Sequence, residues 1–334
     1  MGGTGEAAAT AGVRAGASAG GASGSASASE SVSGGVSAGG GLDRVIGRLG
    51  RWVGDESPAL SRVRFDALRR FVVLGVAVEA WNGLRYRAYQ DDLVLHTAVA
   101  VVQLACLAGA WSGRFTRVAA GVCAAGLASS VALAFPFNAN HQLVQGLLLL
   151  CIVLARPDAD ADRRDALCAA RWVAVAVMFW AGTQKLLWGH YLGGEFLAWR
   201  VAVDPGFAEV FRFVMPDAEW QRLVALESAP GAGPYRVDSL LFVVVSNLGW
   251  LAEWAVAGGL LVGRLRPLAW PAGIAFIVGV ELAAREIFFG GLIVFLLLLF
   301  DERRAAPRSL YLFVPVYAYL FAMAVGWLPH WSFG

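Results

Sequence analysis

The sequence is short of charged residues, and lysine is nearly absent from the few cations that it has. Charged residues make up 16% of the 334 residues, against about 25% in an average soluble domain. Hydrophobic residues make up 58%, and the mean hydropathy is +0.60. These values are typical of an integral membrane protein and argue against a soluble enzyme. The formal net charge of +2 gives no excess of positive charge that would attract a nucleic acid.

Cysteine is also scarce, and the usual metal-binding patterns are missing. The four cysteines are Cys106, Cys123, Cys151 and Cys168, all in apolar stretches. Cysteines in such surroundings behave as small core residues. No CxxC, HExxH or phosphate-loop pattern accompanies them. The sequence therefore predicts neither a disulfide framework nor a metal site.

Three segments of the chain differ sharply in composition. Residues 1–41 are almost all Gly, Ala and Ser, and such a segment has too little apolar surface to offset its chain entropy. We expect a disordered tail, unless the start codon is assigned too far upstream. Residues 42–64 form an Arg-rich juxtamembrane segment that begins with a predicted short interfacial helix. Residues 65–334 contain recurrent apolar runs and form the predicted transmembrane domain.

The apolar runs predict an all-α helix bundle with about nine transmembrane helices, since one span needs roughly 20 apolar residues. The predicted spans are 66–86, 92–112, 115–137, 141–156, 167–189, 239–263, 267–284, 287–300 and 309–329. With nine spans, the segments on one side hold 18 arginines and those on the other side hold 7. Because positive charge favours the cytoplasmic side, we expect the N-terminus inside and the C-terminus outside. We therefore expect the protein to reside in the plasma membrane, with the lipid bilayer around it.

One predicted outer loop, residues 190–238, is too long for a passive connection. Phe207 and Phe211 recur at helical spacing, and Asp217 is typical of the start of a second short helix that runs to Leu226. We expect these helices to lie on the outer membrane surface, with Phe211 shielding a lipid-phase substrate from water. The alternative is an amphipathic cover that takes no part in binding.

Lys185 is the one lysine of the chain, whereas the other 26 basic residues are arginines. It lies about one turn inside the outer end of the span 167–189. A lysine there could simply extend its ammonium to the headgroups, but arginine does this equally well. Lysine differs because it can lose its proton when buried, whereas a guanidinium stays charged. We therefore predict Lys185 as a general base.

Further polar residues are predicted at membrane depth, where a charged side chain costs about 2.5–3.5 kcal/mol on insertion scales. His141 is the second candidate catalytic residue, because it opens the polar span 141–156 at the same predicted depth as Lys185. The candidate substrate-binding residues are Asn140, Gln145, Gln184, Trp180 and Phe211. Three intramembrane carboxylates complete the set, Glu79, Glu253 and Glu281. Buried carboxylates that join helices are the alternative interpretation.

Two of these segments carry a family resemblance. Residues 179–186 read Phe-Trp-Ala-Gly-Thr-Gln-Lys-Leu, followed by Tyr-Leu-Gly at 191–193. This resembles the signature of the HTTM membrane domains, the family that includes vitamin K-dependent gamma-glutamyl carboxylase, with Tyr191 in place of the usual Trp. The Asn-Ala-Asn-His-Gln segment at 138–142 resembles the Asn-His segment of the family. The later span in which the family often carries a histidine reads Gly-Val-Glu-Leu over 279–282 here.

The resemblance implies an activity for the site. In the carboxylase, the lysine that matches Lys185 deprotonates a reduced naphthoquinone, which reacts with O₂ and becomes the epoxide. The strong base formed in that step removes a glutamate γ-proton before CO₂ is added. The histidine that matches His141 assists at the same site, which opens to the lumenal face. A reduced quinone is thus the cofactor that the resemblance implies.

Three functions are therefore open from the sequence. The first is a lyase or oxidoreductase that uses Lys185 on a quinol or another lipid-phase acid. The second is a protein that binds or transports a lipid or quinone without turnover, a hydrophobic small molecule being its partner. The third is a membrane subunit for a separate protein, whose identity the sequence does not indicate.

Overall fold

The computed structural model describes residues 57–86, 93–113, 115–134, 140–226, 229, 231, 233–284 and 286–301, with isolated positions between 311 and 322. All regular structure in these residues is helical. The predicted tail 1–41 and most of the ninth predicted span, 309–329, lie outside the described residues. An all-α architecture is therefore confirmed for the described part of the chain.

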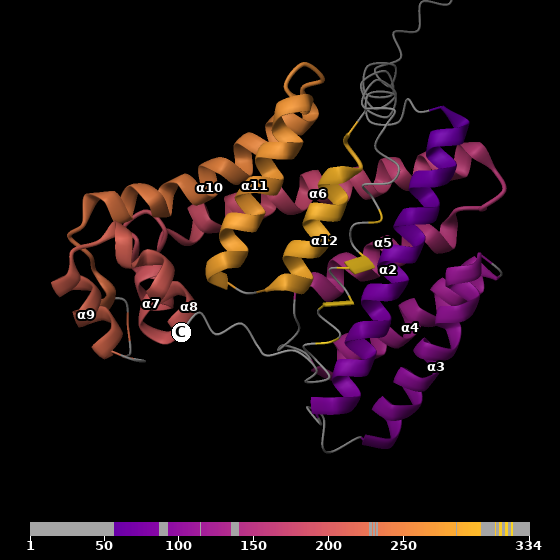
Figure 1. Ribbon diagram of the computed structural model, residues 1–334, viewed down its shortest axis with the longest axis horizontal. Coiled ribbons are helices and arrows are strands. Elements are labelled where there is room, and N and C mark those ends of the chain that lie inside the picture. The colour runs from indigo at the N-terminus through magenta and orange to yellow at the C-terminus, as the bar shows by residue number, and fades with distance from the viewer. Residues whose placement is uncertain are drawn as a thin grey trace, which may run out of the picture. The chain divides into compact units, whose positions relative to one another are not determined.

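Each of the first helices packs on the next one along the chain (Figure 1). Their bounds are α2 Pro58–Tyr86, α3 Leu93–Ser112, α4 Thr116–Ala134, α5 Asn140–Leu154 and α6 Asp160–Trp188. Helix α2 begins before the predicted span and takes in the end of the predicted juxtamembrane segment. Arg64 in that part is buried, with 2% of its surface exposed. The end of the juxtamembrane segment, from Pro58 on, thus belongs to the first long helix. The predicted interfacial helix lies outside the described residues.

The predicted outer loop contains three short α-helices, one more than expected. They are α7 Glu195–Val203, α8 Pro205–Phe211 and α9 Asp217–Leu226. Asp204 caps α8 by accepting a hydrogen bond from the backbone N–H of Gly206, and Pro205 occupies the first turn, where its missing N–H costs nothing. The helix predicted from Asp217 to Leu226 is confirmed at both ends. Helix α7, with nine residues, was not predicted from the sequence.

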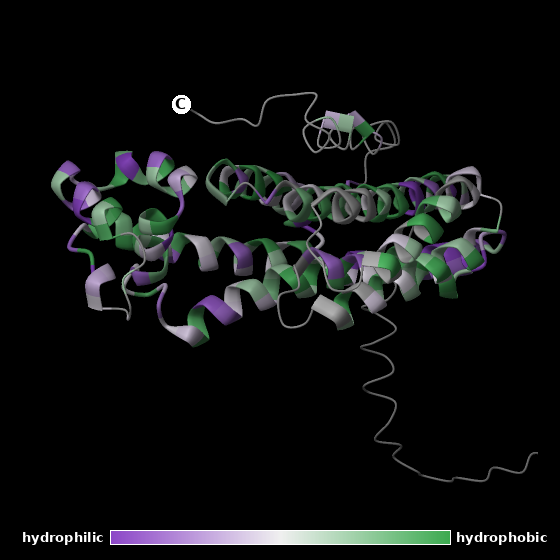
Figure 2. Ribbon diagram, turned by 90° about the horizontal axis from the view of Figure 1, so that it is seen from below, coloured by the Kyte–Doolittle hydropathy of each residue, from purple (hydrophilic) through white to green (hydrophobic). Residues whose placement is uncertain are grey.

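The chain then returns to long helices. These are α10 Leu240–Leu261, α11 Arg266–Ala284 and α12 Ile287–Leu298. Helix α10 packs along α6 and α11, and α11 packs on α12. Figure 2 shows apolar residues along most of the long helices and many hydrophilic ones on the short helices of the loop.

Two hydrophobic clusters hold these helices together. The larger one joins α2, α4, α5, α6, α10, α11 and α12, with Phe71 stacked on Phe295 at 4.0 Å. Two buried arginines cover the end of α12: Arg64 and Arg171 both donate to the carbonyl of Leu299. A helix end has four carbonyls without a helical partner, so these arginines stabilise the bundle. The smaller cluster joins α7, α8 and α9 to the first turn of α10.

Three of the described helices are long and apolar enough to cross a membrane: α6, α10 and α11. Shorter apolar helices lie within α4, α5 and α12. The spans 141–156 and 287–300, predicted to be short, correspond to helices of 15 and 12 residues. The start of α2, the α3–α4 turn and the α5–α6 turn are all predicted on the cytoplasmic side. In the structure both turns lie beside the first half of α2.

Candidate functional site

Lys185 does not stand alone in the structure, because its ammonium is paired with the carboxylate of Glu253. The side chains meet across the interface of α6 and α10, where Nζ donates to Oε1. The Glu253 side chain is 7% exposed and that of Lys185 is 23% exposed. Oε2 of Glu253 is buried and has no hydrogen-bond partner among the described residues. The site is therefore an ion pair with one free acceptor.

A close helix contact sets the depth of this pair. A Cβ placed on Gly182 would lie 2.6 Å from Cδ1 of Trp254 and 3.0 Å from the carbonyl oxygen of Trp250. Only glycine permits this approach. Nε1 of Trp254 donates to the hydroxyl of Thr183 at 3.2 Å. The missing side chain of Gly182 therefore admits α10 as a close neighbour of α6.

The turn after α6 is also tied to α10. The Ser246 hydroxyl donates to the carbonyl of Tyr191 at 2.8 Å, and the Asn247 amide donates to that of Leu192 at 3.0 Å. Nζ of Lys185 lies 5.6 Å from the centre of the Tyr191 ring. Burial raises the pKa of the Tyr191 phenol, and the Glu253 carboxylate raises it further. The phenol therefore stays protonated at neutral pH and can donate a hydrogen bond.

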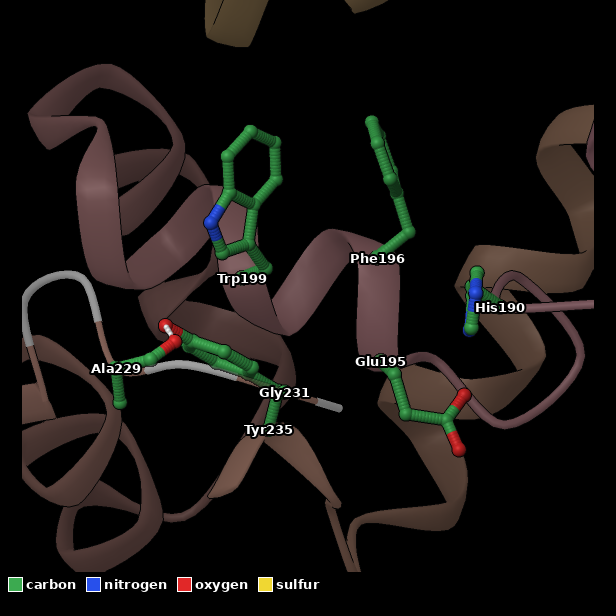
Figure 3. Close-up of a pocket in the computed structure, with 7 residues that line it drawn as sticks. All are labelled: His190, Glu195, Phe196, Trp199, Ala229, Gly231 and Tyr235. Atoms are coloured by element: carbon green, nitrogen blue, oxygen red, sulfur yellow. Dashed lines mark hydrogen bonds between the residues drawn. The ribbon is translucent and has the colours of Figure 1, made fainter. Parts of the chain in front are cut away.

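An open pocket of about 240 Å³ lies beyond this turn (Figure 3). Its walls are His190, Glu195, Phe196, Trp199, Ala229, Gly231 and Tyr235. Figure 3 shows the rings of Phe196 and Trp199 projecting to the same side of α7. Phe196 also stacks on Tyr191 with ring centres 4.6 Å apart. Tyr191 therefore contacts both the ion pair and a wall of the pocket.

The predicted partner His141 lies on the first turn of α5, where its ring is 5.9 Å from that of Phe288 on α12. Lys185 instead faces α10. The structure thus places the two predicted catalytic residues against different helices. Gln145, one turn after His141, is buried at 1% exposure. Asn140 is the first residue of α5, and its side chain lies outside what the structure describes.

The other predicted site residues are dispersed. Trp180 is 55% exposed, and Gln184 is exposed beside Lys185 in sequence. Phe211 packs in the smaller cluster, 5.9 Å from the ring of Phe207 and 5.4 Å from that of Phe242. These contacts show that Phe211 packs the loop helices against α10. Replacing it would therefore also affect stability, besides the predicted shielding of a substrate.

Glu253 is the predicted carboxylate that pairs with Lys185. Glu281 packs against Gly290, where an added Cβ would collide with the Glu281 Cγ. Its Oε2 is buried and has no hydrogen-bond partner within the described ranges. Glu79 lies in α2, and its side chain lies outside the described residues.

Sequence reasoning missed two features of this site. It named Lys185 and Glu253 separately, because they are 68 residues apart and no local pattern links them. It also passed over Glu195, Phe196 and Trp199, which line the pocket. The signal available was the short aromatic run that follows the Gly193-Gly194 turn, in the same segment as the family signature.

Comparison with models of known families, with curated proteins and with solved structures finds no match.

Proposed function

We propose that this chain is an integral membrane enzyme in which Lys185 removes a proton from a lipid-phase substrate. The observation that supports this is the Lys185–Glu253 pair: the chain's one lysine is placed where a carboxylate can accompany its change of charge. Arginine would pair with Glu253 equally well but could not exchange a proton. The HTTM resemblance of residues 179–193 points to the same residue.

The chemistry follows from the two charges. In the ion pair Lys185 already carries a proton. It must first pass that proton to a water molecule on its exposed side before it can act as a base. The free amine at Nζ then takes the proton of a substrate hydroxyl, and the ammonium is formed again. The adjacent carboxylate stabilises that ammonium in a site of low polarity. The pair therefore returns to its starting charge after each proton transfer.

A reduced quinone is the proposed substrate class, following the resemblance. The buried Oε2 of Glu253 is free to accept a hydrogen bond from a hydroxyl. The ring of Tyr191, whose centre lies 5.6 Å from Nζ of Lys185, suits contact with a flat apolar group. When bound, the quinol would supply an acidic hydroxyl and the electrons for a reaction with O₂. His141 contacts α12 rather than this pair, so we assign it no step.

The decisive experiment compares Lys185→Arg, Lys185→Met and Glu253→Gln with the wild type. Purified full-length protein is given a reduced naphthoquinone while O₂ uptake and epoxide formation are measured. Loss of a general base typically costs about 10²–10⁴-fold in rate. We expect Lys185→Arg to lose activity to that extent while its melting temperature stays close to that of the wild type. Full activity of Lys185→Arg would refute the base role.

A second function has support from the same contact. An ion pair between α6 and α10 can simply hold two helices together around a bound lipid or quinone. In that case Lys185→Arg keeps both stability and ligand binding, whereas Lys185→Met loses stability. Bound quinone in the purified wild type without O₂ uptake would favour this non-catalytic function.

The membrane arrangement belongs to the same proposal. We infer that α2, α3, α4, α5 and α12 also cross the bilayer. With the predicted span 309–329 they give nine spans, with the N-terminus in the cytoplasm and the C-terminus outside. The support is the arginine asymmetry of the loops and the meeting of predicted same-side segments at α2. Single cysteines at Ser33 and Ser332, in a background without the native four, should be labelled from opposite sides of the plasma membrane. Labelling from one side would require an even number of spans.

A further inference from the structure

We propose that the chain binds a phosphate group in a second pocket, at the opposite end of α6 from Lys185. This pocket has a volume of about 470 Å³, within the range of about 300–1,000 Å³ that is usual for ligand pockets. It lies between α2, the α3–α4 turn and the start of α6. Its charged walls are Arg62, Arg69, Arg70, Arg163, Asp66 and Asp158.

The arginines of this pocket keep donors that no group in the described residues accepts from. Nη1 of Arg69, Nε of Arg70 and Nε of Arg163 are buried, with no hydrogen-bond partner among the described residues. Arg69 and Arg163 are only 5% and 7% exposed. A buried donor without an acceptor costs about 1–3 kcal/mol, and more when it is charged. Three such donors around one pocket indicate a missing acceptor.

Carboxylates neutralise this charge only in part. Asp66 accepts hydrogen bonds from Arg69 and Tyr311 and pairs with Arg70 at 3.1 Å. Asp160 accepts from Arg163, which also donates to the carbonyl of Pro157. With Asp158 counted as well, four guanidinium groups face three carboxylates among the described residues, which leaves an excess of positive charge there. An anion that enters the pocket would therefore be attracted.

The shape of the donors favours phosphate. A guanidinium presents a planar fork that matches phosphate oxygens, and several forks can share one tetrahedral anion. Gly113 leaves room for one of them, because its Cβ position lies 3.4 Å from Nη2 of Arg69 and its φ of +82° suits glycine. The pocket also lies at the helix ends predicted to face the cytoplasm. The phosphate could therefore come from a lipid headgroup or from a free phosphate in solution.

The test measures binding to the full-length protein in detergent. Inorganic phosphate and phosphatidylglycerol are the two probes, with chloride at matched ionic strength as the blank. Native mass spectrometry counts bound molecules, and the melting temperature gives the apparent affinity. The variants are Arg163→Gln and Arg70→Gln. The matched control is Arg164→Gln, which removes one charge from the same turn of α6 but does not line the pocket.

We expect saturable binding to the wild type, weakened about tenfold in Arg163→Gln and in Arg70→Gln through loss of a charge-assisted hydrogen bond. Arg164→Gln should bind as the wild type does. Competition by inorganic phosphate against phosphatidylglycerol would identify a free-phosphate site, and phosphatidylglycerol binding without such competition would identify a headgroup site. Binding of neither probe, or equal weakening in all three variants, would overturn the proposal. If Arg163→Gln fails to fold, the half-buried Arg70 still decides the outcome.

Discussion

Helix α6 carries a cationic side chain near each end, and the surroundings of the two cations differ. Arg163 and Lys185 are 22 residues apart, about 33 Å along a helix at 1.5 Å per residue. At the Lys185 end, one ammonium meets one carboxylate in a narrow apolar interface with α10. At the Arg163 end, several guanidinium groups surround a wide pocket and share their carboxylates. The first arrangement suits a change of protonation, and the second suits a permanent positive field.

The residue types fit this difference. Arginine cannot lose its proton in a protein, so a cluster of arginines attracts anions at every relevant pH. Lysine can become neutral, so a lone lysine beside a carboxylate can pass a proton on. The comparison can be tested by changes at each end.

The largest effect is expected for Glu253→Leu. Removing the carboxylate leaves the Lys185 ammonium without its counter-charge in an apolar interface, and breaking a buried pair costs about 3–5 kcal/mol. Because Lys185 is 23% exposed, we expect the lower end of that range. Reversible unfolding in mixed detergent measures it. The double variant Lys185→Leu, Glu253→Leu should recover most of the loss, and equal instability of both variants would show that the pair does not contribute through charge.

A smaller effect is expected for Gly182→Ala. The added methyl group collides with Trp254 and with the backbone of Trp250, and overpacking typically costs about 1–3 kcal/mol. Gly249→Ala on α10 is the matched control, since a Cβ there meets nothing within 4 Å. The control should be neutral or slightly stabilising. If both variants melt at the same temperature, the close approach of α6 and α10 does not contribute to stability.

Ser246→Ala should have a moderate effect on the turn beside Lys185. The variant removes the hydrogen bond to the Tyr191 carbonyl, and such a bond contributes about 1 kcal/mol. Because this bond holds the turn next to the pair, any activity at Lys185 should fall together with stability. The half-buried Asn247→Ala variant tests the neighbouring bond. If Ser246→Ala changes activity without changing stability, Ser246 has a more direct role.

The smallest effect is expected at the other end, for Asp66→Asn. Loss of this carboxylate frees the donors of Arg69 and Arg70, so the affinity for inorganic phosphate should rise about threefold if the gain is near 0.6 kcal/mol, the size of a weak surface charge interaction. Isothermal titration of the detergent-purified protein measures the change. A fall in affinity would mean that Asp66 orients the arginines rather than competing with the anion. Removing the carboxylate of Glu253 at the Lys185 end should not raise the affinity for inorganic phosphate in this way.

Local features were predictable because they depend on neighbours in sequence. The apolar runs located every described long helix, although α2 and α6 begin earlier than predicted because polar residues can also occupy the first turns of a helix. Asp217 marked the start of α9 correctly. Lys185 was recognisable as unusual from composition alone. These inferences needed only periodicity, capping preferences and the count of one residue type.

The pairings were decided by the tertiary structure. Lys185 and Glu253 come from helices whose mutual rotation and depth are set by Gly182 and by the bonds of Ser246 and Asn247 to the turn at 191–192. The arginines of the second pocket come from α2 and α6, brought together by packing of the large hydrophobic cluster. Periodicity shows which face of a helix is apolar, but it contains no information on which other helix that face will meet. The charges could therefore be named from the sequence, and their partners only from the fold.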